Sequence, residues 1–225
     1  MSDFATLADA FASRELWQII ALSLLVSLSA TAAATILGLP FGAALAIWRF
    51  PGRQAIVVGA NALLGLPPVV VGLTLYLLLS HSGPLGALDL LFTPEAMVIA
   101  QAALALPIVT ALTHRAAEEQ WREYGDALMD LGASRWRAVP AVVAMARAAM
   151  LTAVLAGFGR TVSEVGAIIV VGGNIAGYTR TMTTAIVLET MKGNLPLALG
   201  LGMVLIGLTV MICAGAFALT GRLDR

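Results

Sequence analysis

Arg160 and Glu164 are charged residues in an otherwise apolar stretch, and their spacing suits an ion pair. Residues four apart lie on the same face of an α-helix. A charge at membrane depth costs about 2.5–3.5 kcal/mol on insertion scales, so it usually faces a bundle interior or water. The pair is therefore either a structural link between helix turns or part of a polar path. On a path, the arginine would favour an anion as the transported species.

The residues that follow this pair are rich in glycine, hydroxyl groups and hydrogen-bond donors. Gly172, Gly173 and Asn174 are typical of a helix end, and four threonines and Arg180 come soon after. Such donors suit a passing oxyanion, but they are equally typical of helix caps. We expect an outer gate loop over residues 172–194. The candidate path or gate residues are Arg160, Ser163, Glu164, Gly172, Gly173, Asn174, Thr179, Arg180, Thr183 and Thr184.

Other chemistries find little support in the sequence. A phosphate-binding loop needs Gly-x-x-x-x-Gly-Lys-Ser/Thr, yet the only lysine, Lys192, follows Met191. Ser163 as a nucleophile would need a base within hydrogen-bond reach, and the adjacent Glu164 points about 100° away on a helix. One cysteine and two distant histidines do not suggest a metal site. We expect no catalytic residue, metal or cofactor in this chain, so it is not an enzyme.

Residues 114–146 form the only long polar interval, and their charges alternate in sign. Leu128, Met129, Leu131 and Trp136 interleave with these charges. The pattern predicts short amphipathic helices broken at Gly132. The segment is either a solvated connector or a docking surface for a cytoplasmic partner, because exposed apolar residues beside arginines are typical of interfaces.

The elements that hold these residues are predicted to be membrane spans. The chain has 225 residues, of which 60% are hydrophobic and 12% charged, whereas soluble domains have about 25% charged residues. We predict an all-α polytopic membrane protein, since a span needs about 20 apolar residues. The five predicted spans cover residues 17–47, 55–79, 96–113, 141–171 and 195–219. The first is longer than a bilayer requires and must tilt, protrude or bend near Pro40.

The orientation follows from the distribution of lysine and arginine. Nine of the thirteen basic residues fall on one side of a five-span arrangement, and the loop over residues 81–94 has none. Basic residues mark cytoplasmic loops. We therefore expect the N-terminus outside and the C-terminus in the cytoplasm, with residues 114–146 also cytoplasmic.

The stretch Asp126-Ala-Leu-Met-Asp-Leu-Gly132-Ala-Ser-Arg-Trp136-Arg resembles the cytoplasmic coupling loop of ABC importer permeases. That loop has Glu-Ala-Ala, three residues, Gly, nine residues and Ile-x-Leu-Pro; here Leu128 replaces an alanine, and Ala144 and Met145 replace Leu-Pro. The resemblance implies docking to an ATP-hydrolysing subunit. The implied docking residues are Asp126, Ala127, Leu128, Gly132, Ala133, Ser134, Arg135, Trp136 and Arg137.

A second resemblance is to the oxyanion branch of these permeases, and it covers roughly residues 20–220. It rests on Gly157-Phe-Gly-Arg-Thr-Val-Ser-Glu164-Val-Gly166, on Gly172-Gly-Asn-Ile175, and on Thr179-Arg-Thr-Met-Thr-Thr-Ala-Ile186. The last stretch and Leu188-Glu-Thr190 look most like the tungstate permeases; molybdate and sulfate remain alternatives. A different class, an ion-gradient-coupled transporter using Glu164, is also open.

The resemblance implies a single type I permease domain over residues 1–225 in a bacterial or archaeal cytoplasmic membrane. It implies a second copy of the chain, two copies of an ABC ATPase that carries ATP and Mg, and an extracytoplasmic oxyanion-binding protein. It implies no nucleic acid.

Overall fold

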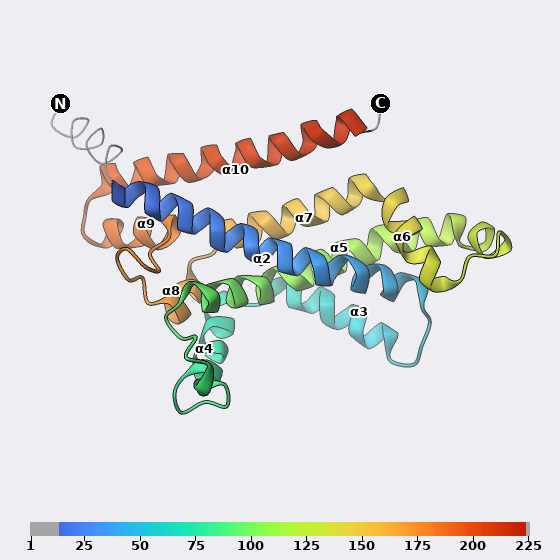
Figure 1. The fold of residues 1–225 in the computed structure, drawn as a ribbon, viewed down its shortest axis with the longest axis horizontal. Coiled ribbons are helices and arrows are strands. Elements are labelled where there is room, and N and C mark those ends of the chain that lie inside the picture. The colour runs from blue at the N-terminus through green and yellow to red at the C-terminus, as the bar shows by residue number, and fades with distance from the viewer. Residues whose placement is uncertain (1–13, 224–225) are drawn as a thin grey trace.

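The computed structural model describes the backbone of residues 14–223 and the side chains of residues 14–218. The predicted domain over 1–225 thus includes residues 1–13 and 224–225, which lie outside the described part. Between residues 14 and 223 every regular element is a helix (Figure 1). The elements are α2 (Arg14–Ile47), α3 (Arg53–Ala62), η1 (Leu63–Gly65), α4 (Pro68–Leu79), η2 (Gly86–Leu88), α5 (Pro94–Asp130), α6 (Arg135–Met145), α7 (Arg147–Val162), α8 (Gly166–Gly172), α9 (Met182–Met191) and α10 (Leu195–Leu223).

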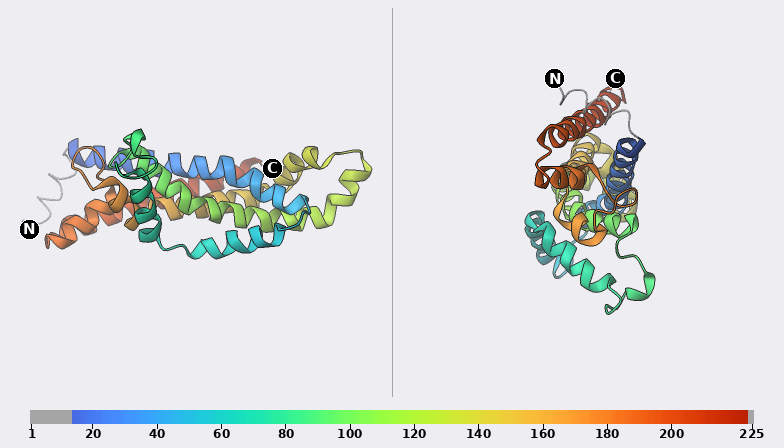
Figure 2. Two further views of the ribbon diagram at one scale, coloured as in Figure 1. Left: turned by 90° about the horizontal axis from the view of Figure 1, so that it is seen from below. Right: turned by 90° about the vertical axis from the view of Figure 1, so that its left-hand side faces the viewer.

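The long helices α2 and α5 form the centre of the bundle and run side by side in two perpendicular views (Figures 1 and 2). Small residues let them approach closely. A Cβ on Gly38 would lie 2.9 Å from the side chain of Val109, and a Cβ on Gly42 would lie 2.6 Å from the carbonyl oxygen of Thr110. Helices in lipid have no hydrophobic driving force for association, so close packing of this kind is what stabilises the pair.

The predicted span over residues 55–79 is formed by two helical parts rather than by one straight helix. The chain forms α3 and η1, then α4, and the two parts are bent by 104°. The cause is the pair Pro67–Pro68, which lacks two backbone N–H donors; Pro67 caps α4 in an extended conformation. In Figure 1, α4 leaves the bundle steeply while α3 lies along it.

The predicted span over residues 141–171 is also divided. α6 and α7 meet at Ala146 with a bend of 78°, and residues 163–165 separate α7 from α8. The predicted helix over residues 96–113 is confirmed but much longer, because α5 runs on to Asp130 without a break. The expectation of a separate short helix between residues 114 and 130 is therefore wrong.

Within residues 14–223, three helices (α2, α5 and α10) are long and apolar enough to cross a membrane, and up to five spans result if each bent pair counts as one. The α2–α3 connection, the α5–α6 turn and the last turns of α10 gather at one end of the bundle (Figure 1). The gate loop with α9 lies at the opposite end. Arg49 and Arg53 in the α2–α3 connection and Arg135 and Arg137 after the α5–α6 turn thus lie toward the same end, as expected for a five-span arrangement.

Candidate functional site

The predicted break at Gly132 is confirmed and forms the tip of the molecule. Gly132 has φ +81°, a conformation that glycine adopts at little cost. The amide of Ala133 donates to the carbonyl of Leu128 at 3.0 Å, which closes the end of α5. The hydroxyl of Ser134 then accepts from the amide of Arg137 at 3.4 Å and caps α6. Residues 126–137 are therefore a tight helix–turn–helix.

This tip presents apolar side chains to its surroundings. Leu131 is 86% exposed and Trp136 is 77% exposed, although the Trp136 ring contacts Trp48 with centroids 4.6 Å apart. Leu128 and Ala133 are half-buried, and Leu128 packs against a core cluster that includes Ala138 and Val142. The other predicted docking residues are exposed: Asp126, Ala127, Gly132, Ser134, Arg135 and Arg137. The nine predicted docking residues thus lie together, with two large apolar groups at the surface.

Behind the tip, Arg53 ties the start of α3 to α5, a contact that the sequence did not predict. Its Nη2 atom lies 2.9 Å from His114 Nε2 and donates to Glu118 Oε1 at 2.7 Å. Its Nε atom donates to the carbonyl of Leu45. These residues are far apart in the sequence, so no local spacing could indicate the link.

The predicted ion pair between Arg160 and Glu164 forms, with 3.2 Å between Nη1 and Oε2. The predicted reason was wrong, because α7 ends at Val162 and Glu164 lies beyond it. Glu164 is 2% exposed, and its Oε1 atom accepts from the amide of Ala167 at 3.0 Å. The carboxylate therefore also accepts a hydrogen bond from the first turn of α8 (Gly166–Gly172). Ser163 is exposed, and its hydroxyl donates to the carbonyl of Gly159 at 2.7 Å.

Replacing Glu164 with alanine should lower stability by about 1–3 kcal/mol, because it leaves a buried amide without an acceptor and Arg160 without its counterion. Glu164→Gln should cost less, since an amide oxygen can still accept from Ala167. The melting temperature of the purified protein in detergent checks this order. Ser163→Ala is the control at an exposed neighbour. Equal melting temperatures for Glu164→Ala and Ser163→Ala would contradict the capping role.

The threonines of the gate loop are engaged in holding the loop itself. The hydroxyl of Thr179 donates to the carbonyl of Gly172 at 2.5 Å and accepts from the amide of Ile175 at 2.9 Å. Thr181 and Thr184 form a capping box at the start of α9. The hydroxyl of Thr183 donates to the carbonyl of Glu164 at 2.8 Å and joins the two parts of the predicted gate.

Left-handed backbone occurs where the sequence predicted the helix end: Gly173 has φ +70° and Asn174 has φ +51°. Gly172 is buried against Met97 of α5. The prediction that this loop caps the neighbouring helices is thus confirmed. Its role as an oxyanion gate stays a prediction.

The two predicted path arginines have different partners. Arg160 binds Glu164, whereas Arg180 Nη1 lies 3.4 Å from Glu15 Oε1 at the start of α2. Ser23 was missed: it accepts from the amide of Met182 at 2.7 Å and so fixes α9 on α2. Among the described residues no group of three or more His, Cys, Asp or Glu side chains is placed to hold a metal ion.

Curated proteins resemble this chain over most of its length. It is 41% identical over 201 residues to a probable anion ABC transporter permease of Haloferax volcanii, covering 87% of each chain. It is 36% identical over 205 residues to the tungstate uptake permease TupB of Peptoclostridium acidaminophilum, covering 91% of this chain and 90% of that one. Identity to the TupB protein of Campylobacter jejuni is 40% over 159 residues. No protein-family model matches the sequence. At this identity and coverage, the chain belongs to the family of ABC transporter permeases.

Proposed function

We propose that this chain is the membrane-spanning subunit of an ATP-driven importer of a tetrahedral oxyanion, with tungstate as its substrate. The similarity to two tungstate uptake permeases, at 36% and 40% identity, carries this proposal. Sulfate and molybdenum permeases also resemble the chain, at 28% identity for the CysT protein of Escherichia coli and 33% for the ModB protein of Azotobacter vinelandii. Sulfate and molybdate are therefore the alternative substrates.

The working assembly contains two copies of this chain, two ATPase subunits and an extracytoplasmic binding protein for the anion. Two copies are what the resemblance to ABC importer permeases implies. The ATPase subunits carry ATP and Mg, and the exposed tip at residues 126–137 is where they dock. The chain lies in a bacterial or archaeal cytoplasmic membrane, with its N-terminus outside and its C-terminus in the cytoplasm.

ATP binding closes the ATPase pair and moves the two docked tips together. Because the tip is packed on α6 and joined directly to α5, its displacement shifts these helices as bodies and switches the path between outward and inward openings. Arg160 and Arg180 supply positive charge toward the outer half of the path. The binding protein provides most of the selectivity, so no tight anion site is needed in the spans.

The alternative of an ion-gradient-coupled transporter would use Glu164 as a proton carrier. Both carboxylate oxygens are already engaged, one by Arg160 and one by the amide of Ala167. This arrangement favours a structural role for the carboxylate, so the ATP-driven function is the better supported.

The decisive experiment reconstitutes the permease with its ATPase in proteoliposomes and adds binding protein loaded with tungstate, molybdate or sulfate. ATP hydrolysis should rise with the tungstate-loaded protein and less with the others. A greater response to molybdate or sulfate would reassign the substrate. No response to any of the three anions, in a complex that assembles, would overturn oxyanion import.

A further inference from the structure

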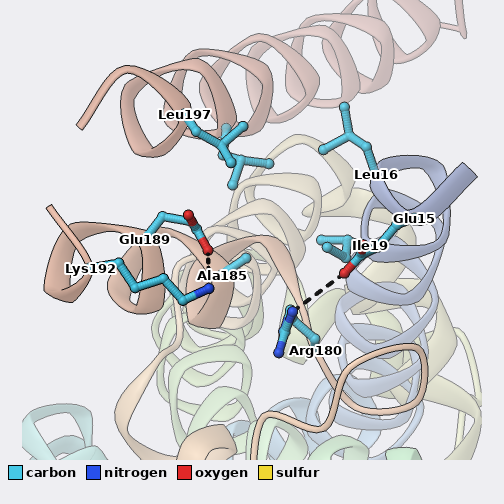
Figure 3. A pocket seen from close by; sticks show the side chains of 9 residues that line it. Glu15, Leu16, Ile19, Arg180, Ala185, Glu189, Lys192 and Leu197 are labelled. Atoms are coloured by element: carbon cyan, nitrogen blue, oxygen red, sulfur yellow. Dashed lines mark hydrogen bonds and ion pairs between the residues drawn. The ribbon is translucent and has the colours of Figure 1, made fainter. Parts of the chain in front are cut away.

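A cavity of about 290 Å³ opens between α2, α9 and α10, at the gate-loop end of the bundle (Figure 3). Charged side chains line one part of the cavity, and aliphatic side chains line the other part. The lining residues are Glu15, Leu16, Ile19, Arg180, Ala185, Glu189, Lys192, Leu197 and Leu201. The ATPase contact does not include these residues, and of them only Arg180 was assigned to the transport path.

The charged wall holds two cations and two carboxylates in separate pairs. Lys192 Nζ lies 2.8 Å from Glu189 Oε1, and Arg180 Nη1 lies 3.4 Å from Glu15 Oε1 (Figure 3). The second pair is long for a charged hydrogen bond, which is usually about 2.7–2.9 Å. In addition, Arg180 Nε is buried and has no hydrogen-bond partner among the described residues. Arg180 therefore has donor capacity to spare.

The two pairs act on one another across the cavity. The hydrogen bond from Lys192 lowers the pKa of Glu189 and burial opposes that change. Asn194, which donates to Glu189 Oε2 at 3.0 Å, and the charge of Arg180 lower the pKa further. Both cations are thus close enough to influence the same carboxylate. With two positive and two negative groups, the wall is neutral overall and suits a ligand that carries both signs.

The apolar wall leads to an exposed apolar surface of α10. Leu197 and Leu201 belong to α10, the most exposed of the candidate spans, and Leu199, Met203 and Ile206 on the same helix are exposed. Trp17, next to the cavity residue Leu16, is 62% exposed, and tryptophan is enriched where hydrocarbon meets headgroups. The cavity therefore lies where acyl chains on one side and polar headgroups on the other are both available.

We propose that this cavity binds the headgroup of a zwitterionic membrane phospholipid with a phosphodiester and a primary amine. Arg180 and Lys192 donate to the phosphodiester oxygens, and Glu15 and Glu189 accept from the ammonium group. One acyl chain lies along Leu197 and Leu201. The bound lipid ties α10 to α2 and α9 at the membrane interface. This proposal does not depend on which anion is transported.

The test uses the purified full-length chain in detergent and native mass spectrometry, with titration of phosphatidylethanolamine. Phosphatidylcholine and phosphatidylglycerol are the matched lipids, because the first cannot donate from its quaternary ammonium and the second has no amine. Phosphatidylethanolamine should bind most tightly. Arg180→Gln should weaken it at least about tenfold, as expected for loss of one charged hydrogen bond. Arg14→Gln, an exposed cation on α2 that does not line the cavity, should leave binding unchanged.

Two further measurements distinguish a lipid site from a site for small soluble anions. Inorganic phosphate or tungstate at millimolar concentration should not displace the bound lipid; displacement by either would identify a site for soluble anions and overturn the proposal. Equal binding of the three lipids, or equal loss of binding in Arg180→Gln and Arg14→Gln, would also overturn it. A Lys192→Gln variant repeats the measurement from α9, in case Arg180→Gln fails to fold.

Discussion

Replacing Leu131 with glutamate should abolish anion-stimulated ATP hydrolysis by the assembled transporter while leaving the permease itself folded. Leu131 is 86% exposed at the turn between α5 and α6, so the fold gains little from its side chain. In the complex, however, a charge at the centre of a buried apolar contact is expensive, and central contacts of this kind cost 2 kcal/mol or more when lost. ATPase co-purification and stimulated hydrolysis measure the effect.

The melting temperature of the permease alone is the control for this variant, and it should match that of the wild type. Trp136→Glu should give the same loss of coupling, with an additional small loss of stability because its ring contacts Trp48. Normal assembly and hydrolysis in both variants would show that the tip is not the docking surface. A lowered melting temperature in Leu131→Glu would show instead that the exposed leucine supports the fold.

The substitution Gly42→Ala should destabilise the bundle strongly, although it adds only one methyl group. That methyl would lie 2.6 Å from the carbonyl oxygen of Thr110 and 2.8 Å from Thr113 Cβ, so α2 and α5 would have to separate. Overpacking of a well-packed interior costs about 1–3 kcal/mol. The yield of folded protein in membranes and the melting temperature in detergent should both fall.

Gly202→Ala on α10 is the matched control, because a Cβ there meets no atom within 4 Å. Alanine has the higher helix propensity, so this variant should be neutral or slightly more stable. If the two alanine variants melt at the same temperature, the close approach of α2 and α5 does not limit stability.

Much of the fold could be predicted because its signals are local. The lengths of α2 and α10 follow from uninterrupted apolar runs, and the turn at Gly132 follows from a glycine between two periodic segments. Pro67 and Pro68 mark the position of the first bend in the sequence, but not its angle. The bend at Ala146 could not be placed, because no proline or glycine stands there. The continuation of α5 to Asp130 was missed because polarity changes there while helix propensity does not.

The candidate site was predicted less completely, because its interactions join distant parts of the chain. The proximity of Arg160 and Glu164 was predicted from their spacing, but the part that Glu164 plays in starting α8 depends on a helix end that hydropathy does not reveal. The partners of Arg180 and Arg53 come from other helices. The threonines looked like free donors, yet burial requires their hydroxyl groups to bind nearby backbone atoms.

The two interrupted spans differ in how their irregular backbone is satisfied. At residues 163–165, the Glu164 carbonyl accepts from the hydroxyl of Thr183 and the Glu164 carboxylate accepts from the amide of Ala167. Groups of the chain itself therefore provide the hydrogen bonds at this interruption. At residues 63–67 most residues are exposed. The amide of Leu66 donates to the carbonyl of Leu63 at 3.2 Å, but Pro68 has no N–H to offer the carbonyl of Leu64. Hydrocarbon cannot hydrogen-bond such a group, which costs several kcal/mol when left bare. We therefore expect the turn at residues 63–67 to face water or another protein surface rather than lipid.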